Sequence, residues 1–173
     1  MARVSLALAL LASVSGCIAP SVRYARPSGA VIGPGVYRVP RGWDYRKDYR
    51  LPVPRLQQIV QSYIGTPYRY GGTSRKGLDC SGLVSVVYRE LNRAKLPRST
   101  RRLKKLGTVV SRGEARAGDL AFFTLGHRGI VDHVGICLGG ERFAHASSSR
   151  GVTYSSLGDD YYRGRLVFVR RLF

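Results

Sequence analysis

Long apolar runs are almost absent from this sequence, and their absence excludes membrane-spanning helices in a mature protein. The one notable run covers residues 6–14, which is too short to cross a bilayer. It follows a single basic residue, Arg3, and precedes small residues, which is the layout of a secretory signal peptide. We therefore expect residues 1–16 to be removed during export.

The signal ends in Val14-Ser15-Gly16-Cys17, which resembles a bacterial lipobox. We predict that Cys17 is lipidated and becomes the mature N-terminus, so that the protein is anchored to a membrane without spanning it. The alternative is an ordinary signal peptide in which this cysteine is incidental. The next two residues, Ile and Ala, carry no obvious inner-membrane retention signal, which favours the periplasmic face of the outer membrane.

Acidic residues are scarce as well, with 10 Asp and Glu against 29 Lys and Arg and a formal net charge of +19. Removing residues 1–16 deletes only Arg3, which leaves 28 basic residues and a charge of +18. Such a surface favours polyanionic surroundings, namely nucleic acid, anionic lipid or an acidic wall polymer. Export and the lack of any recognisable nucleic-acid-binding module argue against nucleic acid.

The chain divides into a tether and one domain. Residues 17–53 are basic and rich in Pro and Gly, without a sustained helical or alternating pattern, and are predicted to form an extended tether. Residues 54–173 have the patterns of a folded domain. Helices come first and strands afterwards, which indicates an α+β fold with an antiparallel sheet of five to six strands.

The local signals place these elements. Pro54 suits the start of a helix that ends at Gly65, and Ser99 suits the cap of a short basic helix closed by Gly107. Alternating or continuous apolar segments separated by Gly-containing turns predict strands at residues 119–124, 130–138, 142–147, 151–155 and 165–173.

The segment 77–92, GLDCSGLVSVVYRELN, contains a cysteine where a helix begins. Leu83, Val87 and Leu91 form the apolar stripe of that helix, which is expected to pack on the sheet. In the first turn Cys80 is exposed to the unpaired N–H groups and the positive end of the helix dipole, which favour a thiolate. This position suits a nucleophile. The alternative is that Cys80 is a small apolar core residue.

The chain has only three histidines, and two of them lie on neighbouring predicted strands. His133 and His145 share one face of this hairpin if its loop holds an odd number of residues or the hairpin contains a bulge, and we expect His133 to point toward the Cys80 helix. A thiol, an imidazole and a second polar group are the parts of a cysteine hydrolase. Spacing alone favours the alternative, in which each histidine is a core or surface residue and Cys80 a small apolar one.

Several motifs in a fixed order resolve this choice: GTPYRYGGTSRKGLDCSGLV, LPRST, GDLAFF and HVGICLGGERFAHASSSRGV. Together they resemble the NlpC family of bacterial papain-like cell-wall endopeptidases, in particular its lipoprotein murein endopeptidases. The resemblance extends from about residue 56 to the C-terminus, roughly two thirds of the chain. It implies a papain-like α+β domain in which the nucleophile helix packs on the sheet.

The resemblance also implies the roles of particular residues. Cys80 of DCSG corresponds to the nucleophile, His133 of HVG to the general base and acid, and His145 of FAHAS to the orienting third member, a place where the family uses His, Asn or Gln. Tyr68 of GTPYRYGG corresponds to the residue whose hydroxyl lies near the oxyanion. Asp79 and Ser81, which flank the nucleophile, correspond to residues that bind polar groups of the substrate.

These roles imply a cysteine endopeptidase that hydrolyses amide bonds in peptidoglycan stem peptides or cross-links, with no cofactor and no metal. Two alternatives stay open: a non-catalytic peptidoglycan-binding lipoprotein, and a papain-like amidase or acyltransferase that uses the same triad on another carbonyl. The sequence leaves open which bond is cut, whether an adaptor regulates the enzyme, and the oligomeric state.

The remaining candidates have plainer interpretations. Cys137 is expected to be a buried free thiol that forms no disulfide with Cys80. Asp132 should point away from His133, Asp119 should hold a turn, and His127 should lie on the surface.

The segment 89–105 holds eight Lys or Arg and one Glu. This basic run is either a solvated face or an aid to encounter with anionic polymers. Within it, Arg98 of LPRST lies in a family motif without a role that the sequence can assign.

Overall fold

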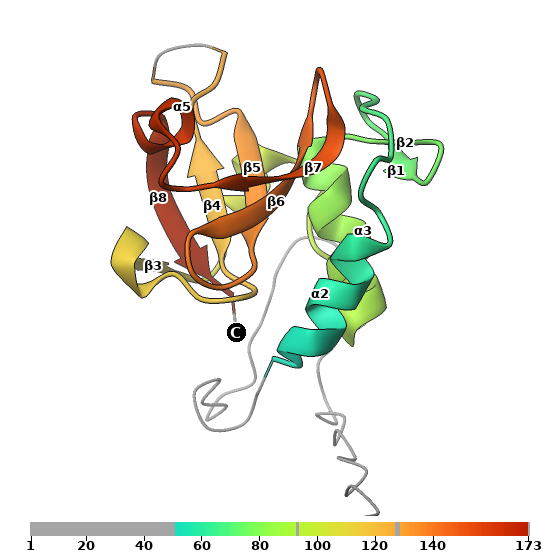
Figure 1. Ribbon diagram of the computed structural model, residues 1–173, viewed down its shortest axis with the longest axis horizontal. Coiled ribbons are helices and arrows are strands. Elements are labelled where there is room, and N and C mark those ends of the chain that lie inside the picture. The colour runs from blue at the N-terminus through green and yellow to red at the C-terminus, as the bar shows by residue number, and fades with distance from the viewer. Residues whose placement is uncertain (1–50, 93, 127–128, 173) are drawn as a thin grey trace, which may run out of the picture.

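A computed structural model describes residues 51–92, 94–126 and 129–172 of the chain (Figure 1). The predicted signal peptide, the predicted lipidation site Cys17, nearly all of the predicted tether and His127 lie outside these residues. No helix in the described part of the chain is both long and apolar enough to span a membrane.

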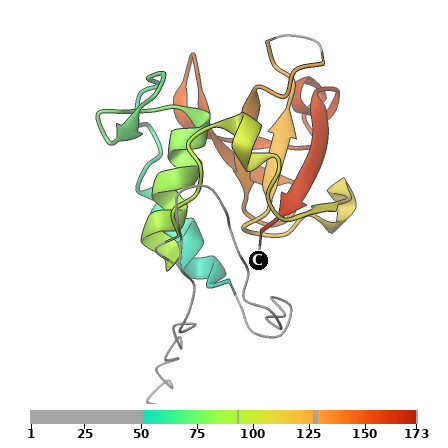
Figure 2. The same cartoon turned by 180° about the vertical axis from the view of Figure 1, so that it is seen from behind.

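Two helices form one layer of the domain. Helix α2 (Val53–Gln61) begins one residue before Pro54 and buries Leu56, Ile59 and Val60. Helix α3 (Cys80–Asn92) begins at the cysteine and buries its apolar stripe, with Leu83 and Val87 both fully inaccessible. The two helices pack on each other, and α3 also contacts the sheet, as Figures 1 and 2 show from opposite sides.

The second layer is a six-stranded antiparallel sheet in the order β3-β8-β4-β5-β6-β7, which confirms the predicted α+β architecture. Its strands are β3 (Thr108–Val110), β4 (Leu120–Phe123), β5 (His133–Cys137), β6 (Arg142–Ser147), β7 (Gly151–Ser156) and β8 (Leu166–Arg171). Between the layers, α4 (Thr100–Leu103) is capped as predicted, because the Ser99 side chain accepts a hydrogen bond from the Arg102 N–H.

The sheet has a buried cluster on each face. Phe122, Val134 and Ala144 belong to the large core that includes α2 and α3. Their neighbours Phe123 and Phe143 belong to a smaller cluster on the opposite face. Successive residues of a strand point to opposite faces, so every strand of this region supplies both cores.

Three features were not predicted. Strands β1 (Thr73–Ser74) and β2 (Gly77–Leu78) form a small pair within the glycine-rich loop, β3 adds an edge to the main sheet, and α5 (Asp160–Arg163) connects β7 to β8. Elements of two to four residues are too short to show a hydrophobic period. Their positions depend on the longer elements that they contact.

Candidate active site

The start of α3 is held by the carboxylate of Asp79. Its Oδ1 accepts hydrogen bonds from the Gly82 N–H at 2.5 Å and from the Ser81 hydroxyl at 2.9 Å, and its Oδ2 accepts one from the Gly71 N–H at 2.8 Å. Gly82 is required for this packing, since a Cβ there would lie 2.1 Å from the Gly72 carbonyl oxygen. The carboxylate therefore fixes both the helix start and the glycine-rich loop beside it.

These contacts bear on the predicted role of Asp79 and Ser81 in substrate binding. Both residues are buried, with exposures of 8% and 5%, and their polar atoms are engaged with each other and with backbone. Substrate contact by either residue stays a prediction. In the structure they position the residue between them, Cys80.

The Cys80 thiol lies against α4 and the beginning of β5. Its Sγ is 3.6 Å from the Thr100 hydroxyl and 4.0 Å from the Asp132 carbonyl oxygen, and the Val134 N–H also contacts it. Burial raises the pKa of the thiol, while hydrogen bonds from Thr100, Val134 and Ser81 lower it. Burial therefore outweighs these hydrogen bonds, and the resting group is a thiol and not the thiolate that position alone suggested.

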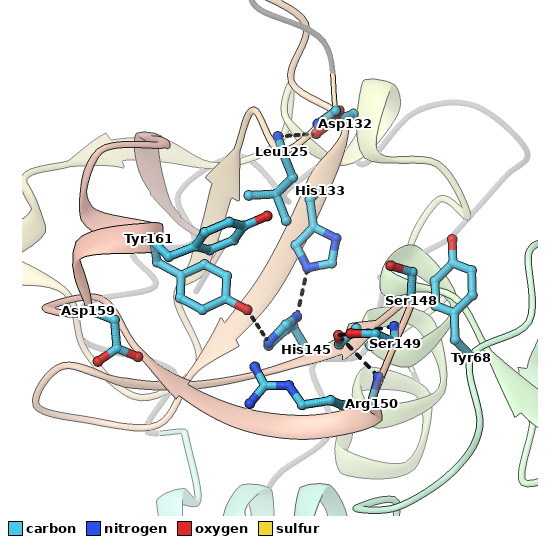
Figure 3. Close-up of a pocket in the computed structure, with 14 residues that line it drawn as sticks. Tyr68, Leu125, Asp132, His133, His145, Ser148, Ser149, Arg150, Asp159 and Tyr161 are labelled. Carbon is cyan, nitrogen blue, oxygen red and sulfur yellow. Dashed lines mark hydrogen bonds between the residues drawn. The ribbon is translucent and has the colours of Figure 1, made fainter.

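The two histidines meet as the hairpin register predicted. Cys137 lies opposite Phe143 in the β5–β6 pair, so the loop between them holds the expected odd number of residues. His133 is four residues before Cys137 and His145 two residues after Phe143, which places both on one face. Nε2 of His133 is 2.9 Å from Nδ1 of His145, and Figure 3 shows the two rings joined in this way.

The face itself differs from the prediction. His133 lies directly opposite Phe123 in the β4–β5 pair, and its ring packs with the smaller cluster, away from the face that α3 covers. The expectation that His133 points toward the Cys80 helix was therefore wrong. The thiol instead contacts backbone on both sides of His133, at the first residues of β5.

His145 is held from behind by two hydroxyls. Its Nε2 is 3.1 Å from the Ser155 hydroxyl on β7 and 3.1 Å from the Tyr162 hydroxyl on α5. The ring also packs against Phe143, at 5.1 Å between ring centroids, and His145 is 1% exposed. With Nδ1 on His133, both nitrogens of this imidazole are engaged and its orientation is fixed.

Burial sets the charge of both histidines. It lowers the pKa of His133 to about 4, against a smaller raising effect of the Asp132 carboxylate. It lowers the pKa of His145 to about 3, with further lowering by His133 and Arg150. At neutral pH the resting site therefore consists of a thiol and two neutral imidazoles.

A cavity of about 730 Å³ opens beside these histidines, and Figure 3 shows residues that line it. Its wall includes Tyr68, the β6–β7 turn with Arg150, and Asp159 and Tyr161 near α5. Burial raises the pKa of Tyr68, and nearby Cys80 adds to this, so the phenol is a protonated donor next to the thiol. The role near the oxyanion that the resemblance implied for Tyr68 stays a prediction.

The plainer interpretations of other residues agree with the structure. The Asp132 carboxylate accepts hydrogen bonds from the N–H groups of Leu125 and Gly126, so it ties the preceding loop. Asp119 accepts a hydrogen bond from the Arg116 N–H within a turn. It also forms a buried ion pair with Arg171, which was not predicted.

Metal and disulfide chemistry can be assessed for the same region. Cys80 and Cys137 are both buried free thiols, and burial raises the pKa of Cys137 to about 12. Within residues 51–92, 94–126 and 129–172, no three His, Cys, Asp or Glu side chains are grouped so that they could hold a metal ion.

Sequence reasoning missed three residues of the site. Thr100, which contacts the thiol, appeared in the sequence only as part of the LPRST motif. Ser155 and Tyr162 had no sequence signal, because the residues around them do not indicate a contact with His145. All three carry hydroxyls, which are common everywhere in proteins, and only the fold brings them to the thiol and the imidazole.

Comparison with known proteins places this geometry in a family. The model of the NlpC/P60 family matches residues 65–171. The chain belongs to the NlpC/P60 family. It is 43% identical over 120 residues to a probable endopeptidase NlpC of Escherichia coli strain K12, an alignment that covers 69% of this chain and 78% of that protein.

Other NlpC/P60 relatives extend the match. The chain is 35% identical over 170 residues to murein DD-endopeptidase MepS/murein LD-carboxypeptidase of Escherichia coli strain K12, which covers 96% of this chain and 89% of that protein. The crystal structure of the NlpC/p60 domain of peptidoglycan hydrolase SagA superposes with a TM-score of 0.60 at 32% identity, covering 69% of this chain and 97% of that one. The papain-like fold implied by the motifs is therefore present.

Proposed function

We propose that this NlpC/P60 protein is a cysteine endopeptidase that hydrolyses amide bonds in peptidoglycan stem peptides or cross-links. The observation that carries the proposal is the hydrogen bond between His133, at the start of β5, and His145 on β6, together with the Cys80 thiol that contacts the backbone at the start of β5. A nucleophile, a base and a group that orients the base are the requirements of covalent acyl transfer. The names of the relatives support peptidoglycan as the substrate.

The first step is proton transfer from the thiol. Because Nε2 of His133 is bonded to His145, Nδ1 is the ring nitrogen that remains for Cys80. Nδ1 takes the proton from Sγ while the sulfur attacks the peptide carbonyl carbon. The low pKa of His133 keeps Nδ1 unprotonated and ready to accept at neutral pH.

This step determines the direction of the hydrogen bonds that link His133, His145 and the two hydroxyls. If Nδ1 of His133 accepts a proton, its Nε2 must already carry hydrogen and donate to Nδ1 of His145. His145 must then carry its hydrogen on Nε2 and donate it to the oxygens of Ser155 and Tyr162. The two hydroxyl oxygens provide acceptors for this N–H, so they stabilise the tautomer that makes His133 a base.

Breakdown of the tetrahedral intermediate uses the same groups. The Cys80 N–H and the Tyr68 hydroxyl are the donors proposed for the oxyanion. The imidazolium of His133 returns its proton to the leaving amine, and the acyl group stays on sulfur as a thioester. Water, deprotonated by His133, then releases the carboxylic acid and regenerates the thiol.

The two alternative functions would use the same site. An amidase or acyltransferase would differ only in the carbonyl that it receives or in the acceptor that replaces water. A non-catalytic binding protein would need neither a free thiol at the start of α3 nor an imidazole oriented by a second histidine, so these features favour the enzyme.

The test is digestion of purified peptidoglycan by the parent protein and by a Cys80→Ala variant under mild reducing conditions, followed by mass analysis of the released fragments. We expect new peptide-cleavage products from the parent only, with masses that identify the bond. Thermal unfolding should show that the variant is folded. Equal fragment release by a folded Cys80→Ala protein would reject the assignment.

We also propose that a lipid on Cys17 anchors the enzyme to the periplasmic face of the outer membrane. The sequence Val14–Cys17 behind an apolar stretch supports this. Labelling of cells with a fatty acid followed by membrane fractionation tests it. We expect label and membrane association in the parent and neither in Cys17→Ser; an unlabelled parent protein would contradict the anchor.

A further inference from the structure

The side chain of Thr100 contacts the nucleophile, and the proposed mechanism leaves it unused. Its hydroxyl lies 3.6 Å from Sγ of Cys80, within the range of a hydrogen bond to sulfur. It is the first residue of α4 and the last of the motif LPRST. The other residues of this motif have contacts that explain why Thr100 lies where it does.

The approach to α4 is fixed on both sides. Leu96 is 5% exposed and belongs to the large core, while the guanidinium of Arg98 donates to the carbonyl oxygen of Gly71. The Gly71 N–H in turn donates to Asp79, the residue before the nucleophile. Arg98, which sequence analysis could not assign, therefore ties this segment to the loop that holds the start of α3.

The helix itself is short but anchored. The Ser99 hydroxyl accepts a hydrogen bond from the Arg102 N–H at 3.3 Å, and Leu103 is fully buried in the large core. Capping from one end and burial at the other restrict the rotation of the single turn. Its first side chain, Thr100, is consequently held against the thiol.

The direction of the Thr100 hydrogen bond is determined once the thiol ionises. A thiolate has no hydrogen to donate and can only accept, so the hydroxyl must be the donor. Charge-assisted hydrogen bonds of this kind are stronger than neutral ones. The Val134 and Ser81 N–H groups are the other donors to this sulfur.

The need for such donors follows from the surroundings of the sulfur. Cys80 is 8% exposed, so water contributes little to its solvation. The titratable groups that interact with it are Asp79, whose negative charge opposes ionisation, and Tyr68; His133 is the base to which the proposed mechanism gives the proton. Removal of one donor should therefore raise the pKa of the Cys80 thiol.

We propose that Thr100 is a catalytic residue whose hydroxyl donates a hydrogen bond to Sγ of Cys80 and stabilises the thiolate as its proton passes to His133. Thr100 gains and loses no proton in this step. The inference rests on the proposed role of Cys80 as nucleophile, but it can be tested without substrate.

The experiment compares Thr100→Val, which keeps the shape and removes the hydroxyl, with Thr100→Ser, which keeps the hydroxyl. The rate of alkylation of Cys80 by iodoacetamide is measured across pH, and peptide mass mapping separates Cys80 from the other cysteines. Thr108→Val, at an exposed position of β3, is the matched control.

We expect Thr100→Val to move the pH midpoint of Cys80 alkylation upward by about one unit, which is about a tenfold lower rate below the midpoint. Thr100→Ser and Thr108→Val should stay close to the parent. A folded Thr100→Val protein with the parent's midpoint overturns the proposal, and so does a shift that Thr100→Ser fails to restore. A restored shift in a protein that releases no peptidoglycan fragments would reject the proposed substrate and leave the role of Thr100 intact.

Discussion

Replacing Tyr162 by Phe and Ser155 by Ala removes the two hydroxyls that contact Nε2 of His145. The Phe variant keeps a ring in the cluster formed with Phe123 and Phe143, so packing should be largely retained. In the double variant the buried Nε2–H has no acceptor among the described side chains that now contact it. The other tautomer then becomes favourable, and it turns the N–H of His145 toward His133.

The size of the effect follows from the contacts. In either single variant the second hydroxyl still accepts, at 3.1 Å, so we expect less than about a fivefold fall in kcat/KM. In the double variant a buried donor is unsatisfied, which costs about 1–3 kcal/mol and corresponds to about a 5- to 150-fold fall. The loss should exceed the product of the two single effects, because either hydroxyl can substitute for the other.

The assay is steady-state cleavage of a defined cross-linked muropeptide, with thermal unfolding of each variant as the control for folding. The fall should lie in kcat, since neither hydroxyl is proposed to bind substrate. A folded double variant with the parent's kcat would refute the tautomer argument. A Tyr162→Phe variant as inactive as His145→Ala would also refute it, because a single hydroxyl would then be indispensable.

Three further predictions concern stability, each measured by urea unfolding. Because burial lowers the folded-state pKa of His133 to about 4 and of His145 to about 3, the unfolded chain binds protons first as the pH falls below about 6.5. Stability should therefore be full above pH 6.5 and fall by about 2 kcal/mol per histidine between pH 7 and pH 5; a flat profile would contradict this. Asp119→Ala should lower the free energy of unfolding by about 3–5 kcal/mol, because Asp119 is almost fully buried and its loss removes the carboxylate that pairs with the partly buried Arg171. Glu141→Gln breaks an exposed pair with Arg112 and should cost less than about 1 kcal/mol. Gly82→Ala should lower the free energy of unfolding by about 1–3 kcal/mol, because the new Cβ forces α3 away from the Gly72 carbonyl. Gly113→Ala, where a Cβ meets open space, should not lower it by this amount. Equal effects of the two substitutions would count against the close packing at α3.

The elements with a strong local signal could be predicted from the sequence. The stripe in α3, the Ser99 cap of α4 and the five apolar strand segments each have a pattern that one local interaction explains. The hairpin register that brings His133 and His145 together followed from the side-chain alternation of strands.

What could not be predicted depends on tertiary contacts. The face of His133 was assigned wrongly because alternation gives relative faces along a strand and not which face a helix covers. The pKa of Cys80 was expected to fall at a helix N-terminus, whereas burial, which no local pattern reports, raises it. Ser155 and Tyr162 reach His145 from β7 and α5, and only the completed fold brings them there.

The most direct test of the account is the stoichiometry of inactivation. The protein is alkylated to graded extents, Cys80 occupancy is determined by peptide mass mapping, and each sample is assayed for release of peptides from purified peptidoglycan. The account predicts that activity falls in proportion to Cys80 occupancy and reaches zero when every Cys80 is labelled. Peptide release that persists with Cys80 fully labelled would contradict it.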